Sequence, residues 1–182
     1  MPGGVHPRWG TANRIAPLGD AYLELLAVVD DHVASGTVLG RAILRRSDGG
    51  DRWFALCLDD HDIDATAARL GLSVEPGGRT KPDGSEVRWR GAGIDDPRRP
   101  PELPFFIAWE TPEAHPGRTP IVHPAGELAI GSIEVAGDGA AFAAWTGDAP
   151  LSVPVRDVDG APGIHAVVLG SPGGPIRLDG AA

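Results

Sequence analysis

The sequence has little of what a secreted or membrane protein needs. Its 182 residues include one cysteine, Cys57, so an intrachain disulfide is excluded, which suits a reducing compartment. The best apolar stretch, from Ala21 to Val29, is interrupted by Glu24 and is far too short to cross a bilayer. The first residues have neither the basic nor the apolar region of a signal peptide. We therefore expect a cytoplasmic protein with no membrane partner.

Positive charge is also scarce. The chain has 16 lysine and arginine residues against 25 aspartate and glutamate residues, which gives a net charge of −9 and a pI of about 5.0. The electrostatic field of such a negatively charged protein repels phosphate backbones and anionic lipid. The sequence therefore predicts no nucleic-acid partner.

Apolar residues, glycine and proline are plentiful. The apolar fraction of 42% is enough for a sizeable core, and the 26 glycines and 18 prolines are typical of a chain with many turns. Together with the many valines and isoleucines, this favours short strands and tight turns over a helical bundle.

An internal repeat is visible at an offset of 74 residues. The triplet at 2–4, Pro-Gly-Gly, recurs at 76–78, the pair Gly-Thr at 10–11 is matched by Gly-Ser at 84–85, and Arg14 is matched by Arg88. In both copies we expect a glycine-rich turn that leads into a half-buried strand. Each copy is followed by another apolar strand, at 20–26 and at 103–109.

The second copy is preceded by further elements. Residues 53–58 form an apolar run that predicts a buried strand, and 59–60 offer an N-cap for a helix whose apolar positions are Ile63, Ala67 and Leu70, with Gly71 as its stop. The first copy lacks this strand and helix, because Glu75 corresponds to Met1. Either Met1 is not the true start, or a neighbouring protomer supplies the element by strand exchange, which predicts a homodimer.

These elements define the expected organisation. Residues 1–126 form a core made of a partial first module (1–30), a connecting helix (31–52) and a second module (53–126). Residues 127–182 form a third, weaker βαβ-type unit packed on the same sheet. In this unit we expect strands at 130–136, 151–155, 164–169 and 175–178 and a helix at 139–145.

The repeated module and the phrases around it resemble the glyoxalase-like domain family of the vicinal oxygen chelate superfamily. The phrases are His-Pro-Arg-Trp-Gly-Thr-Ala-Asn-Arg at 6–14, Gly-Asp-Ala-Tyr-Leu-Glu-Leu at 19–25, Leu-Pro-Phe-Phe-Ile at 103–107 and His-Pro-Gly-Arg at 115–118. The resemblance implies an α+β fold of paired βαβββ modules in a curved, cup-like mixed sheet, here without the opening strand and helix of the first module. In catalytic members a divalent metal in the cup chelates two substrate oxygens.

Few residues of this chain match the metal-ligand positions of the family. Glu24 matches the carboxylate position on a module's last strand, but its counterpart in the second module is Ala108, and Trp53 stands where a histidine is wanted. A catalytic site needs about three protein ligands. Glu24 is therefore the only metal-ligand candidate.

Glu24 is also the candidate catalytic residue. Alternation along the strand places Tyr22 and Glu24 on one face. Enclosure would raise the pKa of the carboxyl group and suit a general base, whereas an ion pair with Arg14 or Arg88 would be structural. The two arginines either point into the cup and bind a carboxylate or lie outside as ordinary cross-strand charges.

Further residues are candidates for substrate binding. Asn13 and His6 flank the Gly-Thr turn, Phe106 is the aromatic counterpart of Tyr22, and His115 lies in a proline-rich loop.

Two classes of function follow from this sequence. One is a lyase, isomerase or dioxygenase-like enzyme acting on a small oxygenated metabolite with a divalent metal or with Glu24 alone. The alternative is a non-catalytic binding or resistance-type protein that sequesters a small molecule in the cup. Fold alone does not decide between them.

Overall fold

The computed structural model describes residues 1–47, 50–81, 83–147 and 149–180. The chain divides into two compact units, and each is made of several chain segments. The first consists of residues 1–48, 57–97 and 105–120, and the second of residues 49–56, 98–104 and 121–182. No helix among the described residues is long and apolar enough to cross a membrane.

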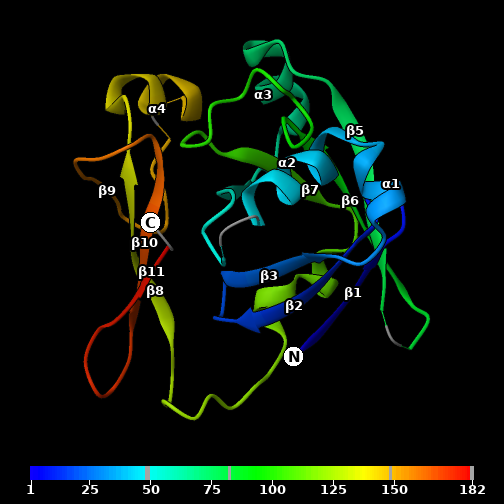
Figure 1. The fold of residues 1–182 in the computed structure, drawn as a ribbon. Coiled ribbons are helices and arrows are strands. Elements are labelled where there is room, and N and C mark those ends of the chain that lie inside the picture. The colour runs from blue at the N-terminus through cyan, green and yellow to red at the C-terminus, as the bar shows by residue number, and fades with distance from the viewer. Residues whose placement is uncertain (48–49, 82, 148, 181–182) are drawn as a thin grey trace. The chain divides into compact units, whose positions relative to one another are not determined.

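The first unit is built on a seven-stranded mixed sheet that curls into a half-barrel. Its strand order is β3-β2-β1-β5-β6-β7-β4. In Figure 1 the blue strands β1–β3 and the green strands β5–β7 belong to this sheet. The strands are β1 (Pro2–His6), β2 (Thr11–Pro17), β3 (Tyr22–Val28), β4 (Cys57–Asp59), β5 (Val74–Thr80), β6 (Glu86–Ala92) and β7 (Phe105–Trp109).

The second half of the sheet is a complete βαβββ module. Strand β4 is followed by helix α3 (Ile63–Leu70) and then by the antiparallel strands β5, β6 and β7, and β4 closes the module by pairing parallel with β7. Strands β1, β2 and β3 form the same antiparallel arrangement, and β1 joins β5. The expected fold class is confirmed.

Helix α3 ends at the predicted Gly71, but its N-cap is Asp62 and not the expected pair at 59–60. The Asp62 side chain accepts a hydrogen bond from the backbone N–H of Ala65, and Gly71 adopts the left-handed conformation that ends the helix. The connecting helix expected between the modules is two helices, α1 (Asp31–Ser35) and α2 (Val38–Ser47). Asp95 joins this region to the first turn, because its carboxylate accepts from the backbone of Leu39 and from the indole of Trp9.

The strand register assigns side chains to the two faces of the sheet. Residues directly opposite each other in neighbouring strands share a face. The face that carries Glu24 is mostly buried, and we call it the inner face. From β3 to β4 it includes Tyr22, Glu24, Thr11, Asn13, Ile15, His6, Arg79, Val87, Trp89, Trp109, Ile107, Phe105, Cys57 and Asp59.

Helix α3 covers part of the outer face. Arg90 points to this face from β6 and forms an ion pair with Asp64 of α3. Over β1 to β3 the outer face is open, since Val5 is 47% exposed and Leu25 is 63% exposed.

The glycines of the repeat are strand residues, so the expectation of turns at 2–4 and 76–78 is wrong. A Cβ on Gly3 would overlap the side chain of Asn13, and one on Gly77 would stand 2.2 Å from the indole nitrogen of Trp89. Both glycines therefore make room for a side chain from the next strand. The other two glycines of the repeat, Gly10 and Gly84, do lie in turns, and both have positive φ.

The second unit has its own four-stranded sheet, in the order β11-β10-β8-β9. It contains β8 (Ala129–Ala136), α4 (Gly139–Thr146), β9 (Val155–Asp157), β10 (Gly163–Gly170) and β11 (Ile176–Asp179). These strands do not extend the first sheet. The strand expected at 151–155 is the short β9, because only the end of that segment pairs with β8.

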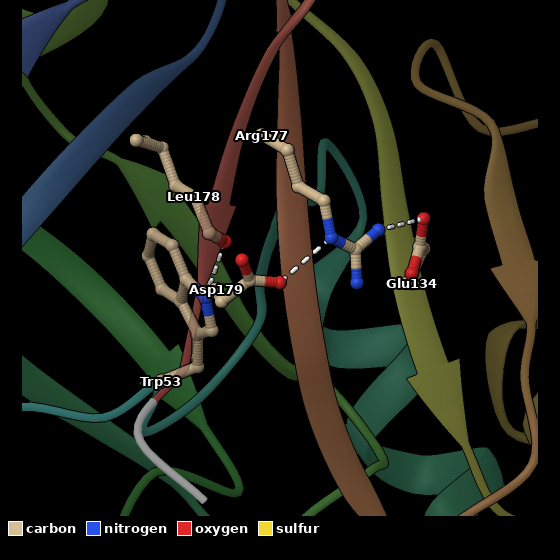
Figure 2. Close-up of polar contacts among 5 residues, drawn as sticks. All are labelled: Trp53, Glu134, Arg177, Leu178 and Asp179. Carbon is tan, nitrogen blue, oxygen red and sulfur yellow. Dashed lines mark hydrogen bonds and ion pairs between the residues drawn. The ribbon is translucent and has the colours of Figure 1, made fainter.

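Figure 2 shows polar contacts made by strand β11 of this sheet. Arg177 of β11 forms ion pairs with Glu134 of β8 and with Asp179. The indole N–H of Trp53 donates to the backbone carbonyl of Leu178 at 3.1 Å. Trp53 therefore packs in the second unit, and the strand expected at 53–58 begins only at Cys57.

Candidate functional site

Glu24 lies on the inner face at the edge strand β3. Its carboxylate accepts a hydrogen bond from the side-chain amide of Asn13 at 2.7 Å, and the Asn13 carbonyl oxygen in turn accepts from the backbone N–H of Gly4. Glu24 is an exposed residue, so water reaches much of its side chain, and the neighbouring sheet desolvates its carboxyl group only in part. Desolvation raises the pKa of Glu24, against the opposing effects of the Asn13 hydrogen bond and of Arg79.

Arg79 supplies the positive charge of this face. It lies on β5 and is only 6% exposed. Burial lowers the pKa of the guanidinium, while Glu24 and Tyr22 act in the opposite direction. Among the described residues, the structure gives the Arg79 side chain no hydrogen bond and no ion pair within 4 Å. The guanidinium therefore faces the inner side of the sheet without a hydrogen-bond partner among the described residues, and its nitrogens are not among the fully buried atoms that lack one.

His6 is a neutral imidazole in the same interior. It is 4% exposed, its Nδ1 lies 3.1 Å from the Thr11 hydroxyl, and its ring makes edge contacts with Trp9 and Trp89. Burial, and secondly the nearby charge of Arg79, lower its pKa from 6.5 to about 4.

His115 reaches the inner face from a loop. It lies between two short 3-10 helices, η1 (Pro112–Ala114) and η2 (Pro116–Arg118), and is 5% exposed. Its Nδ1 accepts a hydrogen bond from the backbone N–H of Gly117, and desolvation and the charge of Arg118 lower its pKa.

Two aromatic residues pack against His115. Its ring makes edge contacts with Tyr22 at 5.6 Å and with Trp109 at 5.5 Å. Burial raises the pKa of the Tyr22 phenol well above its ordinary value, so the phenol keeps its proton. The indole nitrogen of Trp109 is buried, and no described residue accepts its hydrogen bond.

Strand β4 brings two further groups to the inner face. Cys57 and Asp59 are paired with Phe105 and Ile107. The negative charge of Asp59 raises the pKa of Tyr22 and acts on His115 in the same direction, and Cys57 adds to the effect on the pKa of Tyr22 when its thiol is ionised. The site therefore combines one buried cation with several carboxyl, phenol and imidazole groups.

The structure brings together five of the residues that the sequence suggests. Glu24, Tyr22, Asn13, His6 and His115 all lie on or against the inner face.

The other three candidates lie on the outer face. Arg14 is exposed, and Arg88 is exposed beside Glu86 at 3.9 Å. Phe106 is buried on the side of the sheet that carries Arg90 and helix α3. Of the two possibilities for Arg14 and Arg88, pointing into the cup or lying outside it, the structure shows the second, so they are ordinary surface charges.

The donor groups do not fit a metal ion. Within the described ranges, no three histidine, cysteine, aspartate or glutamate side chains come together in a way that could hold one. The carboxylate of Glu24 is engaged by the Asn13 amide, and the Nδ1 atoms of His6 and His115 are engaged by Thr11 and Gly117. The residues present thus lack the three converging ligands of a catalytic site.

Sequence reasoning missed Arg79, Asp59 and the buried indole nitrogen of Trp109. Arg79 follows the second Pro-Gly-Gly triplet directly, and the triplet was expected to be a turn. With the triplet in a strand, alternation places Arg79 on the face of Gly77, over which Trp89 packs. If the triplet is taken as part of a strand, the alternation of its residues predicts that Arg79 lies on the inner face.

Comparison with known proteins identifies the class of this fold. The glyoxalase-like domain family matches residues 1–151, so the chain belongs to that family, which is part of the vicinal oxygen chelate superfamily. Its fold is similar to that of a hypothetical protein from Staphylococcus aureus, known from a crystal structure, with a TM-score of 0.64 and 18% sequence identity over 98% of this chain and 76% of that one. No curated protein matches the sequence.

Proposed function

We propose that the inner face binds a small oxygenated anion, with Arg79 as its counter-charge. The observation that carries this proposal is the buried guanidinium with no hydrogen bond to a described residue. A carboxylate or enolate ligand would accept two parallel hydrogen bonds from it, which is the pairing that guanidinium geometry favours. The function is therefore small-molecule binding, without a step through a metal.

Neighbouring groups support an anionic ligand. The phenol of Tyr22 and the indole of Trp109 are both hydrogen-bond donors at ordinary pH. Glu24 opposes an anion when it is ionised and can donate to it when it is protonated. Because burial raises the pKa of Glu24, we expect the anion to bind more tightly as the pH falls through the titration of this carboxyl group.

A second candidate function is proton transfer at a carbon next to a carbonyl group, as in an isomerase or lyase. The raised pKa of Glu24 favours it, since a general base works best when its pKa is near the working pH. In this reading Glu24 removes the proton, and Arg79 stabilises the negative charge that forms on the substrate oxygen.

The binding proposal is tested by calorimetric titration with lactate and pyruvate and with the uncharged lactamide. We expect the carboxylates to bind at least about tenfold more tightly than the amide, and Arg79→Gln to remove this preference. Arg79→Lys keeps the charge and should lose less. The control is Arg88→Gln on the outer face, which removes the same charge from an exposed position. Equal binding of lactate and lactamide, or equal losses in the two glutamine variants, would refute the proposal.

The catalytic candidate has a separate readout. In deuterated water, proton transfer exchanges the hydrogens next to the carbonyl group of bound pyruvate, which nuclear magnetic resonance detects. Exchange that is accelerated by the protein and lost in Glu24→Gln supports a base. Binding of pyruvate without accelerated exchange contradicts the proton-transfer candidate and leaves the binding proposal standing.

A further inference from the structure

A cavity lies in the second unit. It is open, has a volume of about 390 Å³ and is lined by helix α4, the segment at 149–154, strands β8 and β9, and Glu102. Its size is within the range of small-molecule pockets. All of its lining residues belong to the second unit, so the cavity is separate from the inner face described above.

The walls of this cavity are largely apolar. Phe142 lines it from α4, and Leu151, Val153 and Val155 line it from the segment that follows. Helix α4 has only glycine, alanine and aromatic residues before its last residue, Thr146, yet none of its residues is fully buried. The helix is well defined nonetheless, because Asp138 caps its beginning and Gly147 ends it. Apolar surface is thus left uncovered where a hydrocarbon group could pack against it.

The polar groups of the cavity are acidic. Glu102, Asp138 and Asp157 line it, and none of the described residues around it is a lysine, arginine or histidine. One oxygen of Asp138 is engaged in capping, since it accepts from the backbone N–H groups of Ala140 and Ala141.

Glu102 carries a carboxylate that has no partner among the described residues. Its Oε2 atom is buried and accepts no hydrogen bond from any described residue. The side chain lies against Gly137, where a Cβ would stand 2.8 Å from the Glu102 Cγ. The other carboxylate oxygen, Oε1, is not buried in this way and also accepts no hydrogen bond from a described residue, so it is the atom that a ligand in the cavity can reach. A carboxylate with no donor from the protein favours a cationic partner.

We infer that this cavity binds a small organic cation, an ammonium group attached to an apolar chain or ring. The ammonium group donates to Glu102, and the apolar part packs against Phe142 and Leu151. Charge and shape together select this class: the carboxylates exclude anions, and the apolar walls disfavour small hydrated ions.

The experiment compares uncharged and charged ligands of the same shape. Calorimetric titrations are run with butylammonium, hexylammonium and 2-phenylethylammonium, and with the corresponding alcohols. We expect at least one ammonium compound to bind at millimolar concentration or below, about tenfold or more tightly than its alcohol. Equal binding of both members of each pair overturns the inference, and so does the absence of binding by all three cations.

Two variants locate the site. Glu102→Gln should remove the preference for the ammonium compound, because it replaces the carboxylate by an uncharged group of the same shape. Glu127→Gln removes the same charge from an exposed position of the second unit and should keep the preference. Loss in both variants, or in neither, contradicts the assignment to Glu102. Arg79→Gln leaves this binding unchanged, which separates the outcome from that of the proposed anion site.

Discussion

His6 should make the protein sensitive to acid. In the folded protein its pKa is about 4, against 6.5 for an ordinary histidine, because the imidazole is buried and lies near Arg79. The unfolded chain therefore takes up a proton at a pH where the folded chain does not, and the free energy of unfolding falls as the pH drops from about 7 to 4. Each tenfold difference in proton affinity corresponds to about 1.4 kcal/mol, so the loss attributable to His6 is about 3 kcal/mol, roughly 2 kcal/mol of it by pH 5.

The measurement is urea unfolding between pH 7.5 and pH 4 for the original chain and for His6→Gln. The variant loses stability at pH 7 through poorer packing, but it lacks this imidazole. We therefore expect the difference between the two chains to shrink by about 3 kcal/mol as the pH falls. Contributions from Glu24 and His115 are common to both chains and cancel. His61→Gln, which removes an exposed imidazole, is the control. A difference that does not change with pH would show that His6 is not held neutral by the fold.

Three further predictions concern local packing. Gly77→Ala places a Cβ against the indole of Trp89, and we expect a loss of about 1–3 kcal/mol in chemical denaturation; a neutral effect would contradict the packing of Trp89 across this glycine. Asp62→Ala removes the cap of α3 and should cost about 1 kcal/mol, whereas Asp62→Asn should retain most of it. Trp53→Phe removes the hydrogen bond to the Leu178 carbonyl and should also cost about 1 kcal/mol, measured in the same way; an unchanged midpoint would mean that the bond contributes nothing.

Much of the fold could be predicted from local signals. Helix α3 was predicted because its apolar spacing and its glycine stop act within a few residues, and the repeat correctly indicated two related sets of strands. The split of the connecting helix was not predicted. The backbone N–H of Gly36 bonds to the carbonyl of Val33 and that of Thr37 to the carbonyl of Ala34, which ends α1 before α2 begins.

The site was predicted only in part, because its composition depends on the register of several strands. Alternation within one strand was enough to place Glu24 and Tyr22 on a common face. Which arginines share that face depends on the strand pairings that run from β3 through β2, β1 and β5 to β6. A shift of one residue in any of these pairings would move each arginine beyond it in this series of strands to the opposite face, Arg14 and Arg88 to the inner face or Arg79 to the outer face. The burial of His115 depends on a loop that folds against the turn at Gly19, where no periodic pattern exists.

The interleaving of the two units also has a consequence for how the chain folds. It passes between them after residues 48, 56, 97, 104 and 120, so neither unit is one continuous segment. The segments 49–56 and 98–104 are held at both ends by the first unit, and they find their partners in strands that come much later in the sequence, as Trp53 does with Leu178. Contacts of such long sequence separation are slow to form. A chain ended after Pro120 would leave Trp53 without its partner strand, so the two units should unfold as one cooperative transition and should resist separation by truncation.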